Sequence, residues 1–137
     1  MPAGLDKFLS DLTRVSVQVS AGNGYPERGC SSLALLFANG TKLQADYWRI
    51  IVDGKAGISS FDHQQQYGLP APIDAIREVQ ELIQDKFVID ARLPGETGDL
   101  IFNFDGNIKL QIFNFTGYEV WEITFPNGAV EYSNYAK

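Results

Sequence analysis

The sequence predicts a single α+β domain spanning residues 1–137, with antiparallel β-meanders, one main helix packed on the sheet and a short N-terminal helix. Three observations predict it: apolar and polar residues alternate over most of the chain, short glycine-containing turns separate these segments, and only two stretches have helical spacing. The short connections indicate antiparallel neighbours, because parallel neighbours need crossovers of a dozen or more residues.

The two helical stretches lie near the N-terminus and in the middle of the chain. The first has one apolar face made by residues at i, i+3, i+4 and i+7, namely Leu5, Phe8, Leu9 and Leu12. It is expected to start near Gly4 and to end before the β-branched residues that follow Arg14. The main helix is expected from about Ile73 to Asp85, where an apolar stripe is backed by charged and amide side chains, and Asp74 suits its first turn.

Strands are expected wherever apolar residues alternate or cluster between turn signals. The expected ranges are 15–20, 33–37, 42–52, 56–61, 87–93, 100–104, 108–112, 121–125 and 130–135. Asn39-Gly40, Asp53-Gly54 and Asn127-Gly128 favour tight hairpin turns, since these dipeptides readily take positive φ. The last four ranges read as one continuous antiparallel meander.

Two parts of the chain echo each other. Phe37 to Gln44 resembles Phe104 to Gln111, and each ends in Lys-Leu-Gln after a glycine-containing turn. Further along, Trp48 and Trp121 each follow an acid and one other residue, and each precedes a charge and an isoleucine. Two interpretations stay open: ordinary hairpins that share turn chemistry, or a pseudo-symmetric pair of meanders whose tryptophans face one core.

Composition narrows the possible chemistry. Eleven basic and seventeen acidic residues give a net charge of −6, which disfavours a nucleic-acid partner because phosphate binding needs clustered Lys and Arg. The single cysteine, Cys30, excludes an internal disulfide and a multi-cysteine zinc site, and the single histidine, His63, excludes His-rich metal sites. We therefore expect no metal and no cofactor.

No membrane or export segment is expected. The longest apolar run, Leu33 to Ala38, is six residues long, whereas a membrane span needs about 20. The N-terminus lacks a basic start followed by an apolar stretch, which indicates a cytoplasmic protein.

The loop from Ser59 to Gly68 holds the densest polar chemistry, with Asp62 beside His63. A hydrolase that uses His63 as general base needs a carboxylate to orient the imidazole and a nucleophile beyond it. Adjacent side chains point apart, so the favoured interpretation is that Asp62 and His63 fix the local backbone by hydrogen bonds.

Acids and tyrosines near other turns are candidates for protein contacts. Glu96 with Asp99 is one carboxylate pair, and Asp46 with Glu119 is another if the echo is spatial. The full set of predicted contact residues is Asp62, His63, Glu96, Asp99, Tyr118 and Glu119.

Several of these residues belong to a recognisable pattern. A Trp-Arg-Ile strand is followed by Ser-Ser-Phe-Asp-His, a proline-rich entry to a helix, Thr-Gly-Asp-Leu and then Gly-Tyr-Glu-x-Trp-Glu-Ile. Over about residues 31–128 this resembles small bacterial proteins that look like immunity proteins of polymorphic toxin systems. The matching residues are Trp48, Arg49, Asp62, His63, Gly98, Asp99, Leu100, Gly117, Tyr118, Glu119 and Trp121.

The resemblance implies a non-enzymatic protein that binds and silences a toxin made beside it. An acidic surface can pair with the basic substrate cleft of a nuclease, which fits a basic toxin as partner. Two alternatives come from other classes: a small-molecule-binding domain with an apolar pocket between helix and sheet, lined by Trp48 or Trp121, and a hydrolase that uses His63 with a carboxylate.

Overall fold

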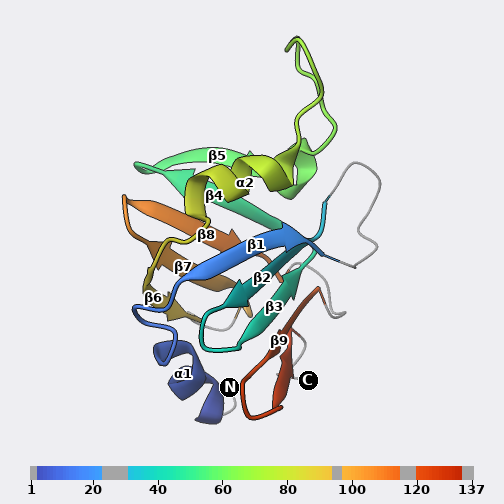
Figure 1. The fold of residues 1–137 in the computed structure, drawn as a ribbon. Coiled ribbons are helices and arrows are strands. Elements are labelled where there is room, and N and C mark those ends of the chain that lie inside the picture. Colours follow the sequence, from blue (N-terminus) through green and yellow to red (C-terminus); the bar gives the residue numbers. More distant parts are fainter. Residues whose placement is uncertain (1–2, 23–30, 94–96, 115–119, 134–137) are drawn as a thin grey trace.

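The computed structural model describes residues 3–22, 31–93, 97–114 and 120–133, and it arranges their strands as two five-stranded antiparallel sheets (Figure 1). Sheet 1 contains, in spatial order, β1 (Val17–Ala21), β2 (Leu33–Phe37), β3 (Lys42–Ala45), β9 (Trp121–Thr124) and β10 (Val130–Tyr132). Sheet 2 contains β5 (Lys55–Ser59), β4 (Trp48–Val52), β8 (Ile108–Ile112), β7 (Leu100–Phe104) and β6 (Val88–Arg92). The predicted α+β class with antiparallel sheets is confirmed.

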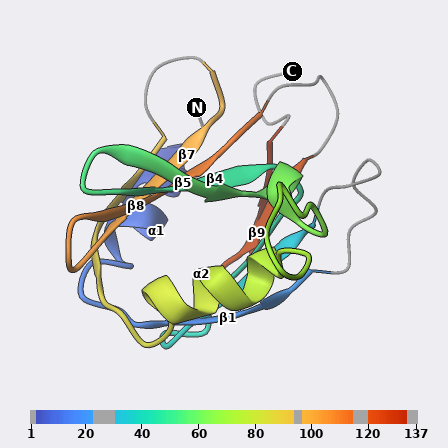
Figure 2. The ribbon, with the colours of Figure 1, turned by 90° about the horizontal axis from the view of Figure 1, so that it is seen from above.

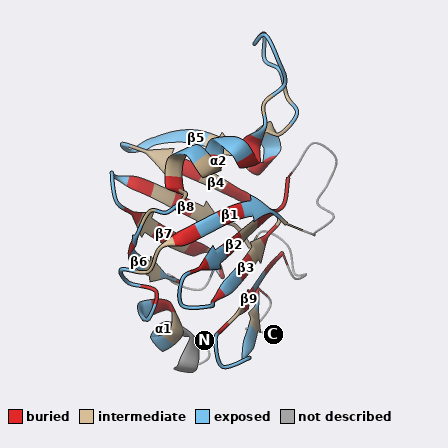
Figure 3. Ribbon diagram, viewed as in Figure 1, coloured by how far each residue is buried: buried red, intermediate tan, exposed pale blue. Residues whose placement is uncertain are grey.

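The apolar faces of the two sheets enclose one core (Figure 3). Phe37 of β2 stacks on Phe102 of β7 with ring centroids 5.7 Å apart, so the sheets contact each other directly. Ser16 and Phe87 form an isolated antiparallel bridge, which ties the start of β1 to the start of β6. The two sheets are therefore joined along that side.

The helices are α1 (Ala3–Ser10), the 3-10 turn η1 (Ser60–Asp62) and α2 (Ala75–Ile83). α2 lies within the predicted range and packs against β1 and β5, the edge strands of the two sheets (Figure 2). Its buried face consists of Ala75, Ile76, Val79 and Ile83. The apolar stripe of the sequence therefore closes the opening between the sheets. None of the described helices has the length and apolar character that crossing a bilayer requires.

Polar side chains of α2 also satisfy the free edge of β1. Gln80 Nε2 donates to the Val19 carbonyl at 2.8 Å, and the Val19 amide donates to Gln84 Oε1 at 2.7 Å. These two bonds replace those that a further strand would make, so the edge is not open to another chain.

Two expectations about strand continuity were wrong. The predicted strand 42–52 is split at Asp46–Tyr47 into β3 of sheet 1 and β4 of sheet 2, and β9 leaves β8 to join sheet 1. Tyr47 and Trp48 are both buried, as are Val120 and Trp121. Two consecutive buried residues break the period of two, because neighbouring side chains on one strand face opposite sides.

The echo in the sequence is a true internal pseudo-symmetry. The first half contains α1 and β1–β5, and the second contains α2 and β6–β10 in the same order. β3 pairs with β9 of the other half, just as β8 pairs with β4, and the registers match: Leu43 faces Ile123, and Leu110 faces Ile50. Each half thus gives its fourth and fifth strands to the sheet of the other half.

The two tryptophans occupy equivalent core positions. The indole nitrogen of Trp48 donates to the Ser31 carbonyl at 2.8 Å, and that of Trp121 donates to the Gly98 carbonyl at 2.7 Å. The backbone amide of Trp48 donates to Ser60 Oγ, and that of Trp121 donates to Ser133 Oγ. Each indole thus bonds the segment that leads into a strand of the opposite sheet. Such contacts are expected for residues that face one shared core.

Candidate functional site

The most prominent surface feature is the segment between η1 and α2, which we call the projecting loop (residues 63–74) and which extends away from both sheets (Figure 1). Two backbone bonds of 2.8 Å close its base, from Gln64 N to the Ile73 carbonyl and from Ile73 N to the Gln65 carbonyl. Near its tip, Leu69 N donates to the Gln66 carbonyl, and Gln66 Nε2 donates back to the Leu69 carbonyl at 2.8 Å. The loop therefore has its own hydrogen-bonded structure.

Asp62 stands at the base of the projecting loop and holds η1. Its carboxylate accepts from the Ser59 amide at 2.9 Å and from the Tyr67 hydroxyl at 2.9 Å. The second bond, to an anionic acceptor, keeps the pKa of Tyr67 above its usual value. Asp62 thus links the start of the loop to its tip.

His63 caps the main helix from the same place. Its Nδ1 accepts the Ala75 backbone amide at 3.1 Å, which leaves the proton of the neutral ring on Nε2. Asp74 supplies the second cap, because its carboxylate accepts the Arg77 amide at 3.2 Å. The two adjacent residues Asp62 and His63 therefore have backbone-fixing roles and bond different partners.

Apolar side chains on and beside the projecting loop are exposed to solvent. Tyr67 is 67% exposed and Leu69 47% exposed on the loop itself, and Phe61 at its base is 49% exposed while stacking on Tyr47. Sequence reasoning missed Phe61 and Leu69. Leu69 stands between Gly68 and Pro70, and an apolar residue in such a turn was the available signal.

A shallow groove of about 370 Å³ separates the loop from α2. The loop lines it mainly with apolar side chains, from Leu69 to Ile73, while Asp74 at the junction and Glu78 and Glu81 of α2 add carboxylates. Arg77 also lines it and pairs with Glu81 at 3.4 Å. The groove consequently offers an apolar floor beside a rim with excess negative charge.

Asp99 occupies a different place from Asp62 and His63. Its carboxylate accepts the Asn114 amide at 2.7 Å, and its own amide donates to Thr97 Oγ1 at 3.2 Å, so it fixes the turn before β7 to the end of β8. No described hydrogen bond joins it to Asp62 or His63. The other three predicted contact residues, Glu96, Tyr118 and Glu119, lie outside the described residues.

The two tryptophans are core residues. Trp48 is fully buried and Trp121 is 1% exposed, and the space between α2 and β1 is filled by the buried face of the helix. Trp121 also borders a small recess on sheet 1 together with Asp46 and Glu122. Within the described ranges, no three His, Cys, Asp or Glu side chains are grouped so that they could hold a metal ion.

Comparisons of the chain with protein-family models, with curated proteins and with solved structures found no match.

Proposed function

We propose that the protein is a non-enzymatic binding module that recognises a protein partner through the projecting loop and the groove beside it. The observation that carries this function is the presentation of Tyr67 and Leu69, both exposed, on a loop held by its own hydrogen bonds. Tyrosine is enriched among the residues that dominate the energy of protein interfaces, and the exposed leucine beside it adds apolar contact area.

The internal bonds of the loop favour binding energetically. Ordering a flexible loop on association costs about 1–2 kcal/mol per residue in backbone entropy, and a loop already held in one conformation avoids most of that cost. Tyr67 is tied to Asp62, and Leu69 is held by two bonds to Gln66. Both anchors are thus presented before a partner arrives.

Charge indicates the kind of partner. The chain has a net charge of −6, and the groove rim carries three carboxylates against one arginine. Opposite charge on a partner accelerates encounter and disfavours acidic competitors. A basic protein is therefore the proposed partner, and a basic toxin that the chain neutralises in the cytoplasm, as an immunity protein does, is its specific form.

Co-purification tests this function. The tagged chain, expressed in its native host, is expected to retain a basic protein, and a Tyr67→Ser/Leu69→Ser variant is expected to lose it. Ile89→Ser is the matched control, because Ile89 is 53% exposed on β6, away from the loop. Retention of the same protein by the loop variant would contradict the proposed function.

A further inference from the structure

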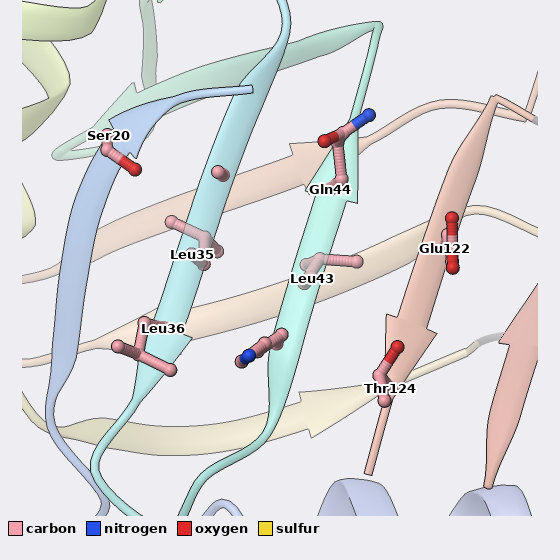
Figure 4. A pocket seen from close by; sticks show the side chains of 9 residues that line it. Ser20, Leu35, Leu36, Leu43, Gln44, Glu122 and Thr124 are labelled. Atoms are coloured by element: carbon pink, nitrogen blue, oxygen red, sulfur yellow. The ribbon is translucent and has the colours of Figure 1, made fainter. Parts of the chain in front are cut away.

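A second surface is formed by the outer face of sheet 1, the face turned away from the core. Strand pairing places its side chains in two rows across the strands: Ser20, Ala34, Gln44, Glu122 and Tyr132 in one, and Gln18, Leu36, Lys42, Thr124 and Val130 in the other. Figure 4 shows part of this face, with Ser20 on β1, Leu36 on β2, Gln44 on β3 and Glu122 and Thr124 on β9.

This face is hollowed in two adjoining places. A hollow of about 340 Å³ has an apolar floor that includes Ala34 and Leu36. A smaller recess of about 140 Å³ is lined by Asp46, Trp121 and Tyr132. Gln44 and Glu122 border both, so the hollow and the recess form one continuous depression.

Because of the pseudo-symmetry, each position on the outer face of sheet 1 can be compared with an equivalent position in sheet 2, which has the same strand arrangement and different side chains. At the position equivalent to Glu122 stands Arg49, whose Nε donates to Gln111 Oε1 at 2.9 Å and whose guanidinium lies 5.6 Å from the centre of the Phe113 ring. Phe113 occupies the position of Asp46, and Gln111 that of Gln44. In sheet 2 a guanidinium and an aromatic ring thus stand where sheet 1 has two carboxylates.

The residues that line the hollow also differ from their equivalents in sheet 2. Ala34 stands where the second half has Ile101, and Thr124 stands where the first half has Ile51. Both replacements remove side-chain volume from the outer face of sheet 1. The depression on sheet 1 therefore results from smaller and acidic side chains at positions where sheet 2 has larger side chains.

Within the described ranges, neither Asp46 nor Glu122 forms an ion pair. Among the described residues, the only side-chain ion pair within 4.0 Å joins Arg77 and Glu81, and both lie on α2. Lys42 lines the hollow, in the row next to that of Glu122. Burial raises the pKa of Asp46 and the Ser32 hydroxyl lowers it by less, so a cation placed here would relieve a cost of folding.

We propose that the outer face of sheet 1 docks a basic segment of a protein partner, with an arginine side chain in the recess between Asp46 and Glu122 and an adjacent apolar side chain in the hollow over Ala34 and Leu36. The choice of arginine follows the second half, where a guanidinium bonds the equivalent glutamine. This assignment rests on the proposed function, since it specifies the chemistry of the proposed partner and adds a second surface that contacts that partner.

The test uses a defined probe, the capped pentapeptide Ser-Leu-Arg-Leu-Ser, titrated into the ¹⁵N-labelled full chain. Chemical-shift changes are expected at β3 and β9 around Gln44 and Glu122, and a matched peptide with glutamine in place of arginine should bind about tenfold more weakly. Glu122→Arg should weaken binding by at least about tenfold, because it places in sheet 1 the guanidinium that sheet 2 already has.

Asp105→Arg is the matched control. It makes the same change of net charge on the exposed turn between β7 and β8, and it should leave the affinity within about twofold. If Glu122→Arg does not give a folded spectrum, Asp46→Asn replaces it with the same expected loss. Equal effects of Glu122→Arg and Asp105→Arg, shifts confined to the projecting loop, or no binding would each overturn the assignment. The proposed function would stand in these cases if the loop variant still loses the native partner.

Discussion

Asp46 lies in an environment that disfavours its charged form. It lies at the bend between β3 and β4, where burial raises its pKa above the ordinary 3.8 and the Ser32 hydroxyl lowers it by less. The folded protein therefore holds this proton more tightly than the unfolded chain does. Stability is accordingly expected to fall as the pH rises from about 3.8 through the raised folded-state value.

Asp46→Asn removes this dependence. The variant should gain free energy of unfolding relative to the wild type as the pH rises from 3 to 7, because an amide has no charge to bury. Urea denaturation at a series of pH values measures the difference. A difference that stays constant across this range, or that turns against the variant as the pH rises, would show that burial does not penalise the carboxylate.

At the scale of elements, α2 both fills the opening between the sheets and protects the edge of β1. Gln80 and Gln84 lie one helical turn apart, so both amides reach the backbone of Val19. Loss of either side chain leaves a partly buried backbone group with water as its only partner. A net hydrogen bond contributes about 0.5–1.5 kcal/mol to stability.

The double variant Gln80→Ala/Gln84→Ala should lose about 1–3 kcal/mol in free energy of unfolding. It should also associate at high concentration, because the β1 edge becomes available for strand pairing. Glu81→Ala, on the exposed face of the same helix, is the control and should change stability by less than about 0.5 kcal/mol. Denaturation and light scattering provide the two readouts. A double variant as stable and monodisperse as the control would refute this role.

At the scale of the whole molecule, the two halves hold each other through exchanged strands. The β3–β9 and β4–β8 ladders join residues of different halves, while the projecting loop is the covalent connection between the halves. A protease site inserted between Tyr67 and Gly68 should therefore give a nicked protein that stays folded. Its midpoint of thermal unfolding should depend on concentration, because the fragments separate only on unfolding. Separation of the fragments under native conditions would contradict the exchanged arrangement.

Much of this architecture could be predicted from the sequence. The hairpin turns, the main helix and the repeated Lys-Leu-Gln and tryptophan motifs depend on local chemistry that a single chain displays. The sequence did not predict that β4 joins sheet 2 or that β9 joins sheet 1. Hydrophobic periodicity indicates that a segment is a strand, but it does not say which strand it pairs with. The adjacent buried pair Tyr47–Trp48 was the local sign of that crossing.

The candidate site was less predictable for a related reason. The roles of Asp62 and His63 depend on the Tyr67 hydroxyl and the Ala75 amide, which folding brings to them. The depression on sheet 1 depends on residues from β1, β2, β3 and β9, and only the pairing register shows that they share one face. Such sites become visible when the strand order is known.

The most direct test of the proposed function is the dissociation constant of the complex with the native partner, measured by calorimetry for the wild type, the loop variant and a control variant. We expect Tyr67→Ser/Leu69→Ser to weaken binding by at least about tenfold, equivalent to about 1.4 kcal/mol, whereas Ile89→Ser should stay within about threefold of the wild type. An unchanged constant for the loop variant, or an equal loss for Ile89→Ser, would contradict the proposed function.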